Sequence, residues 1–345
     1  MSSIYSLIKD VKSISIIGME KNVGKTTLLN KIIDEIGYKK IIGITSIGRD
    51  GEEVDVVTDT KKPRIYINEG TLIATARECL RNCDITKEIL LVTDFNTPMG
   101  DIIIIRARSS GYVDIAGPSY NKQLKYILKK MEEFGCNFTI VDGALGRKSS
   151  AIGDISEATI LSTGASLSLD MTKVIDETKK TVKLLTLPEV DKETKRIAKN
   201  SIDLSRVTLI YKDSITVNLT SNNSIDNMQE IKEYLNKDLT DIVVKGAITD
   251  RFVENLIKNR ENYEKINLVA LDGTRFFIDN NLYKKSILSG IELKVLNKIN
   301  LLFLTCNPWS PRGFEFPKKE FKDILSKEIN IPIIDVVGDY DEIYR

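Results

Sequence analysis

The sequence predicts an α/β protein with a doubly wound, mostly parallel sheet that carries an antiparallel insertion, and with a second, smaller α/β domain. Two patterns support this fold class. An apolar strand pattern near the N-terminus runs directly into a glycine-containing loop and an amphipathic helix. Strand and helix patterns then alternate along most of the 345 residues, a length at which one hydrophobic core usually stops growing. We therefore expect domains at residues 1–205 and 206–345, with the insertion at about residues 58–120.

The first motif joins a strand, a loop and a helix within residues 13–37. Isoleucines at positions 14, 16 and 17 precede Gly18, as expected for a strand that is buried in a parallel sheet. From Thr26 onward, apolar residues recur at helical spacing. The loop of residues 18–26, which reads Gly-Met-Glu-Lys-Asn-Val-Gly-Lys-Thr, therefore opens a helix.

A loop in this position can wrap a polyphosphate with its main-chain N–H groups and the helix N-terminus. Lys25 would then reach the β- and γ-phosphates and act in catalysis, while the hydroxyl of Thr26 would hold Mg²⁺. The alternative is an ordinary strand-turn-helix with a surface lysine, but the flanking strand and helix favour the nucleotide site. The candidate nucleotide-binding residues of this segment are Gly18, Asn22, Val23, Gly24, Lys25, Thr26 and Thr27.

A second polar loop, at residues 47–52, follows a strand expected at residues 40–46. Ligands of open parallel sheets bind outside the carboxyl ends of the strands, so Arg49 and Asp50 can approach the same phosphates. We expect Arg49 to offset phosphate charge, and Asp50 to hold Mg²⁺ or orient a water molecule as a catalytic residue. The alternative is a solvated turn, in which Asp and Arg are common.

The insertion is expected because residues 58–120 carry several strand patterns with few helices between them. Such an insertion can lie over a nucleotide as a lid or form a docking surface. We expect one helix at residues 71–80, and strands within 58–67 and at 89–93, 101–105 and 112–116.

Asp142 is the second carboxylate of the expected site. It ends an apolar strand pattern that begins at residue 137, after an amphipathic helix expected at residues 121–134. A strand-end carboxylate downstream of a phosphate-binding loop is the pattern by which such proteins hold Mg²⁺. Asp142 is therefore a candidate magnesium ligand and catalytic residue, although strands also often end in simple Asp-Gly turns.

The remaining chain continues the alternation, with a strand expected at residues 159–164 and a helix at 169–184. The turn at residues 306–313 contains Trp309, the only tryptophan. It is either a ligand or partner loop, or a turn whose indole is packed, and the preference of indole for burial favours the second interpretation. Strands of the second domain are expected at 207–211, 241–245, 266–271, 301–305 and 331–337.

Composition excludes several classes of protein. With Lys+Arg 50 and Asp+Glu 49, the net charge is +1, and no basic block indicates a nucleic-acid partner. No apolar run is long enough to span a bilayer and the start lacks signal-peptide features, so we expect a cytoplasmic protein without a membrane partner.

The 4 cysteines form no C-x-x-C pair, and the absence of histidine excludes Ser-His-Asp and Cys-His nucleophiles as well as histidine metal sites.

Several segments together resemble one known family: GMEKNVGKTTLLN, GITSIGRDGE, TPMGD, AGPS, VDGA and NPWSPRG. They are similar to the small subunits of lysine aminomutase reactivases, and the loop spacing G-x-x-x-x-x-G-K-T resembles the dethiobiotin synthetase and cobyrinate synthase branch of the P-loop NTPase superfamily. The resemblance implies an ATP-dependent chaperone with ATP and Mg²⁺ as ligands. It also implies two partners, a larger MutS-like ATPase subunit and a cobalamin-dependent aminomutase that is freed of damaged cobalamin.

Two alternatives stay open. A metabolic ligase resembling dethiobiotin synthetase shares the loop spacing, but Arg49-Asp50 stands where that family's substrate lysine is expected, and residues 142–146 depart from its Glu-Gly-Ala-Gly-Gly-like turn. A binding module could hold ATP without hydrolysing it. GTP is disfavoured relative to ATP because no N-K-x-D sequence occurs.

Overall fold

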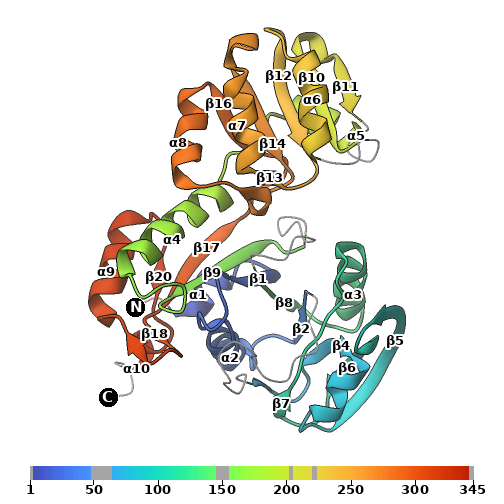
Figure 1. The fold of residues 1–345 in the computed structure, drawn as a ribbon. Helices are drawn as coiled ribbons and strands as arrows, with labels where there is room; N and C mark the ends of the chain where they lie inside the picture. Colours follow the sequence, from blue (N-terminus) through green and yellow to red (C-terminus); the bar gives the residue numbers. More distant parts are fainter. Residues whose placement is uncertain (1–2, 48–63, 145–154, 202–204, 220–223, 342–345) are drawn as a thin grey trace. The chain divides into compact units, whose positions relative to one another are not determined.

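The computed structural model describes residues 3–47, 64–144, 155–201, 205–219 and 224–341. The chain forms two compact units (Figure 1), of which the larger contains Met1–Lys179 and Asn300–Arg345, and the smaller contains Lys180–Ile299. This division differs from the expected boundary near residue 205. The segment that begins at Asn300 belongs to the larger unit and not to the smaller one, because its strand β17 pairs with β9 and with β20.

Within the described residues, the larger unit contains a nine-stranded sheet in the order β20-β17-β9-β1-β8-β2-β4-β6-β5. Neighbouring strands from β20 to β4 run parallel, whereas β6 is antiparallel to both β4 and β5. The mostly parallel α/β architecture is therefore confirmed. The strands are β1 Ser13–Gly18, β2 Ile42–Ser46, β4 Leu72–Ala76, β5 Lys87–Thr97, β6 Gly100–Ala107, β8 Phe138–Ala144, β9 Ala158–Gly164, β17 Leu301–Asn307 and β20 Ile333–Ile334.

Helices cover both faces of this sheet. On β8, Ile140 belongs to a cluster that contains the buried residues of α2, whereas Val141 packs with Leu124 and Leu128 of α3. Because successive strand residues point to opposite faces, α2 and α3 lie on opposite faces. The helices of this unit are α1 Ile4–Ile8, α2 Lys25–Ile36, α3 Asn121–Glu133, α9 Lys318–Glu328 and α10 Gly338–Asp341, and α4 Met171–Leu185 leads into the smaller unit.

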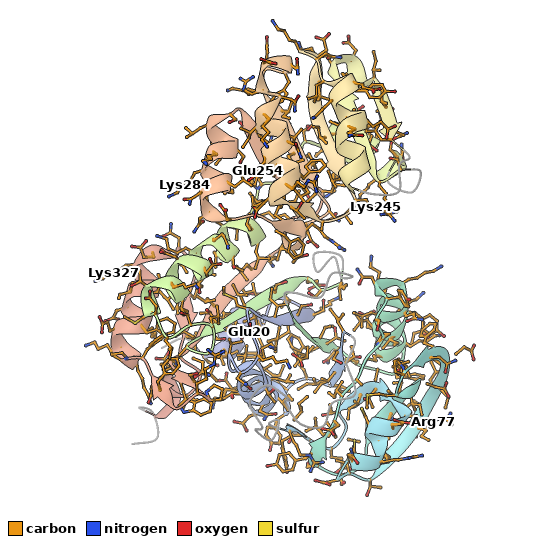
Figure 2. The ribbon with its side chains drawn as sticks, in the orientation of Figure 1. Glu20, Arg77, Lys245, Glu254, Lys284 and Lys327 are labelled. Carbon is orange, nitrogen blue, oxygen red and sulfur yellow. The ribbon has the colours of Figure 1, made fainter. Side chains whose placement is uncertain are left out.

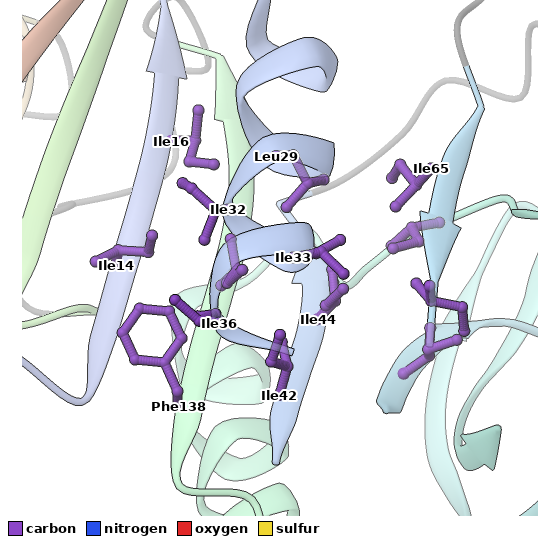
Figure 3. Packing of buried hydrophobic residues seen from close by; sticks show 14 of the residues in the cluster. Ile14, Ile16, Leu29, Ile32, Ile33, Ile36, Ile42, Ile44, Ile65 and Phe138 are labelled. Carbon is purple, nitrogen blue, oxygen red and sulfur yellow. The ribbon is translucent and has the colours of Figure 1, made fainter. Parts of the chain in front are cut away.

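The α2 helix forms because its apolar residues make one continuous stripe. Figure 3 shows Leu29, Ile32, Ile33 and Ile36 packed among isoleucines of β1 and β2 and Phe138 of β8. Complete burial of side chains of this size stabilises a fold by roughly 1.5–3 kcal/mol each. The stripe therefore fixes α2, and with it the preceding loop, against the centre of the sheet.

The insertion is antiparallel in part, as predicted. Its strands β6 and β5 extend the main sheet at one edge, and β3 Ile65–Ile67 pairs antiparallel with β7 Gly111–Val113. The helix expected at residues 71–80 is wrong, because β4 and a 3₁₀ helix, Arg77–Asn82, occupy that segment. Every residue of β4 is buried between β2 and β6, and the strand pairing outweighs the helical spacing.

The smaller unit has its own mixed sheet, in the order β11-β10-β12-β14-β16. Helices α6, α7 and α8 contribute to one buried cluster and α5 to another, so this unit also has a core of its own. No helix in the described ranges has the length and apolar composition that crossing a bilayer requires. The elements are β10 Val207–Tyr211, β11 Thr216–Leu219, β12 Leu239–Val244, β14 Ile266–Ala270, β16 Ile291–Val295, α5 Lys192–Ser201, α6 Ser224–Tyr234, α7 Asp250–Lys258 and α8 Asn280–Leu288, with the short strands β13 Ile248–Thr249 and β15 Phe276–Phe277.

Candidate functional site

The loop between β1 and α2 has a backbone conformation fixed by two left-handed residues. Gly18 ends β1 and Lys25 begins α2, as the sequence predicts. Asn22 has a φ of 60° and Gly24 a φ of 89°, while Val23 between them is buried. The N–H of Met19 donates to the carbonyl oxygen of Ser162 at a distance of 3.0 Å. This hydrogen bond ties the first residue after β1 to the neighbouring strand β9.

The side chain of Lys25 turns back over the loop. Its Nζ lies 3.2 Å from the carbonyl oxygen of Glu20, a residue labelled in Figure 2. A Cβ placed on Gly18 would lie only 2.6 Å from the same Nζ. The Lys25 ammonium therefore lies against the end of β1. A side chain at position 18 would take space that the lysine side chain fills, so glycine there leaves room for it.

The first turn of α2 favours an anion. The N–H of Leu28 donates to the carbonyl oxygen of Gly24 at the start of the helix, and the N–H groups that precede such a bond point out of the helix N-terminus. The first turn contains no acidic residue, although carboxylates are the side chains that stabilise this end of a helix. Lys25 adds its own positive charge, so a bound polyanion would be stabilised by both.

Asp142 lies on β8, the strand next to β1. It pairs in register with Ile16 of β1 and with Ser46 of β2, and Gly18 pairs with Ala144. Because these strands are parallel, Asp142 lies near the same carboxyl edge of the sheet as the loop. The side chain is half-buried. The strand neighbouring β1 therefore carries Asp142 two residues before the level at which the loop begins.

A magnesium ion is compatible with the donors in this region. Among the described residues, no three of His, Cys, Asp and Glu form a cluster that could hold a metal. Mg²⁺ is usually held by one or two carboxylates together with water and substrate phosphates rather than by a protein cage. Thr26 and Asp142 supply donors of that kind. Arg49 and Asp50, which the sequence also assigns to the site, lie outside the described residues.

Asn307, at the end of β17, contacts the predicted phosphate loop, whereas the sequence identifies only its turn, as a candidate ligand or partner loop. Its Nδ2 donates to the carbonyl oxygen of Asn22 at 3.1 Å, and a Cβ placed on Gly24 would lie 3.6 Å from its Cβ. The polar turn after a strand was the only signal in the sequence. Trp309, two residues later, is 51% exposed, so the expectation of a packed indole is wrong.

Two of the buried cysteines have raised thiol pKa values. Cys79, Cys136 and Cys306 are buried, and burial raises the pKa of Cys136 to about 11 and also raises the pKa of Cys306. Since the thiolate is the nucleophilic form, raised pKa values disfavour nucleophilic chemistry at both thiols.

No protein-family model, curated protein or solved structure matches this chain. The assignment of function therefore depends on the geometry of the loop and on the motifs of the sequence.

Proposed function

We propose that this chain is an ATP-binding P-loop protein whose site consists of Gly18, residues 22–27 and Asp142, with Arg49 and Asp50 as further members. The observation that carries the proposal is the position of the Lys25 ammonium, turned over the loop at the N-terminus of α2. The ammonium donates to the Glu20 carbonyl oxygen within the loop, and from this position it can offset the charge of a polyphosphate that binds at the helix N-terminus.

In this proposal the phosphates are bound chiefly by main-chain N–H groups and by one lysine. Main-chain N–H groups of the loop and of the first turn of α2 donate to phosphate oxygens, and Lys25 offsets the charge on the β- and γ-phosphates. Thr26 and Asp142 would hold Mg²⁺, which supplies further neutralisation of phosphate charge when bound.

We also propose, from the resemblance of the motifs, that the chain is the nucleotide-binding subunit of a reactivase for a cobalamin-dependent lysine aminomutase. A nucleotide can drive the exchange of damaged cobalamin only if it binds two conformations with different free energy. The γ-phosphate would supply that difference, because hydrolysis removes the contacts that it makes with Lys25 and Thr26. The partners would be a larger MutS-like ATPase subunit and the aminomutase.

The proposal is tested by measuring ATP hydrolysis by the purified chain, alone and with the larger subunit and inactivated aminomutase. We expect hydrolysis to increase with the partners and aminomutase activity to return only when ATP and fresh adenosylcobalamin are both present. ATP binding without hydrolysis in any mixture would instead indicate a binding module. ATP-dependent carboxylation or ring closure of a diamine by the chain alone would indicate a ligase.

A further inference from the structure

One side chain, Asn307, joins the phosphate loop to a separate surface element. Its Nδ2 donates to the carbonyl oxygen of Asn22, and its Oδ1 accepts from the N–H of Trp309 at 3.1 Å. Trp309 begins a short antiparallel hairpin in which β18 Trp309–Ser310 pairs with β19 Phe314–Glu315. We refer to residues 309–315 as the Trp309 hairpin.

Both hydrogen bonds require one orientation of the carboxamide. If the oxygen and nitrogen of Asn307 were exchanged, its oxygen would face the Asn22 carbonyl and its NH₂ group would face the Trp309 N–H. An acceptor would then face an acceptor at Asn22, and a donor would face a donor at Trp309. A movement of the Asn22 carbonyl therefore acts on the Asn307 carboxamide, which also accepts the hydrogen bond from Trp309 at the start of the hairpin.

The surroundings leave Asn307 little room to move independently. A Cβ placed on Gly164, at the end of β9, would lie 2.5 Å from the carbonyl oxygen of Asn307, and the N–H of Ala165 donates to that oxygen at 2.9 Å. Asn307 is thus fixed to β9 by its backbone and to the phosphate loop by its side chain.

The Asn22 carbonyl belongs to the part of the loop that a bound phosphate would affect most. Asn22 has a positive φ, a left-handed conformation that asparagine adopts more readily than most residues other than glycine. Val23, the next residue, is buried, and the hydrogen bond from Asn307 is one contact that holds the Asn22 peptide unit. When N–H groups of the same loop turn toward phosphate oxygens, the neighbouring peptide units must adjust as well.

We propose that Asn307 is a positioning residue that couples occupancy of the phosphate loop to the Trp309 hairpin, and that the hairpin changes conformation when Mg·ATP binds. This inference rests on the proposed ATP site. The hairpin lies against α9 through a row of aromatic rings, with the centroids of Phe314 and Phe316 5.7 Å apart and those of Phe316 and Phe321 5.3 Å apart. A change at Asn307 can therefore reach α9 as well as the exposed indole.

The test uses the fluorescence of Trp309, which reports without labelling because it is the only tryptophan. Mg·ATP binding to the full-length chain is measured by equilibrium dialysis, and indole emission is recorded at saturating Mg·ATP. We expect a change in emission for the unmodified chain. In Asn307→Asp, which keeps an acceptor for Trp309 but loses the donor to Asn22, affinity should fall about fivefold and the emission change should disappear at saturation. Asn307→Ala should behave in the same way.

Asn300→Ala is the matched control, because Asn300 precedes the opposite end of β17 and its Nδ2 donates to the carbonyl oxygen of Glu157 at 3.2 Å. It should keep both affinity and emission change. If the unmodified chain binds Mg·ATP without an emission change, or if the change persists in either Asn307 variant, the coupling is refuted while the ATP site stands. If dialysis detects no Mg·ATP binding, the proposed function fails and the coupling fails with it.

Discussion

At the scale of single residues, the candidate site depends on where the lysine and the two left-handed residues lie. Gly18, Gly24 and Lys25 lie as their spacing predicts, because a strand, a loop and a helix in direct succession leave the chain few paths. The contact between Asn307 and Asn22 is not predicted, although the turn of Asn307 is a candidate ligand loop, because the two residues are 285 positions apart along the chain. Local patterns carry no information about a contact at that separation.

Asp142 gives the first prediction, because its assigned role depends on charge. Asp142→Asn keeps the size of the side chain but removes the negative charge that would hold Mg²⁺. We expect Mg²⁺-dependent ATP hydrolysis to fall by about 10²-fold or more, while affinity for ATP without metal stays within about twofold. Steady-state hydrolysis over a magnesium titration measures the first effect, and equilibrium dialysis with EDTA measures the second.

Asp94→Asn is the control for that experiment, since Asp94 is exposed on the edge strand β5. It should leave both measurements unchanged. Identical magnesium dependence in Asp142→Asn and the unmodified chain would remove Asp142 from the site.

At the scale of elements, the sequence predicts most of the buried strands and the long helices α2, α3 and α4, but it assigns one segment to the wrong type. The sequence locates buried strands such as β1, β2, β9 and β10 within one or two residues, because they are short, rich in β-branched residues and flanked by turn residues. The segment at β4 was misassigned as a helix. The apolar residues of this segment fit the spacing of a helix as well as that of a strand. Its strand structure follows from pairing with β2 and β6, which are distant in the sequence.

The N-terminus of α5 supplies a prediction at this scale. Asp191 precedes the helix, and its Oδ1 accepts from the N–H groups of Glu193 and Thr194 at 3.0 and 2.9 Å. The hydrogen bond from the Thr194 N–H is the largest cause that lowers the pKa of Asp191 in the folded protein. Asp191→Ala should therefore reduce the free energy of unfolding of the smaller unit by about 1 kcal/mol at pH 7.

The pH dependence of that difference has a definite sign. A carboxyl group whose pKa is lowered by folding stabilises the fold above its unfolded pKa, here 3.8, and the contribution is lost as pH falls through the lower folded pKa. Urea unfolding at pH 7 and at acidic pH should show the difference between the two proteins shrinking with acid. A difference that is independent of pH would contradict the charged cap.

At the scale of the whole molecule, the larger unit is made from both ends of the chain. The strand β17 pairs with β9 although the smaller unit lies between them in the sequence. An apolar strand pattern shows that a strand is buried, but it does not show which sheet buries it. The expected boundary at residue 205 therefore assigned β17 and β20 to the second domain.

This division predicts which fragments fold. The fragment of residues 180–299 contains a complete sheet and its own buried cluster, so it should unfold cooperatively in urea when monitored by circular dichroism. Residues 206–345 should not, because they lack Leu184 and Leu187 of that cluster and carry β17 without its partner β9. Cooperative unfolding of the second fragment alone would contradict the division.

The central claim is that the loop between β1 and α2 binds the phosphates of ATP through Lys25. The most direct measurement is isothermal titration of Mg·ATP into the full-length chain and into Lys25→Ala, with Lys31→Ala, in the body of α2, as the control. Loss of a charge-assisted hydrogen bond should weaken binding by roughly 10- to 150-fold in Lys25→Ala. Far-UV circular dichroism and the affinity of Lys31→Ala should stay unchanged. Equal Mg·ATP affinity in Lys25→Ala and the unmodified chain would contradict the account.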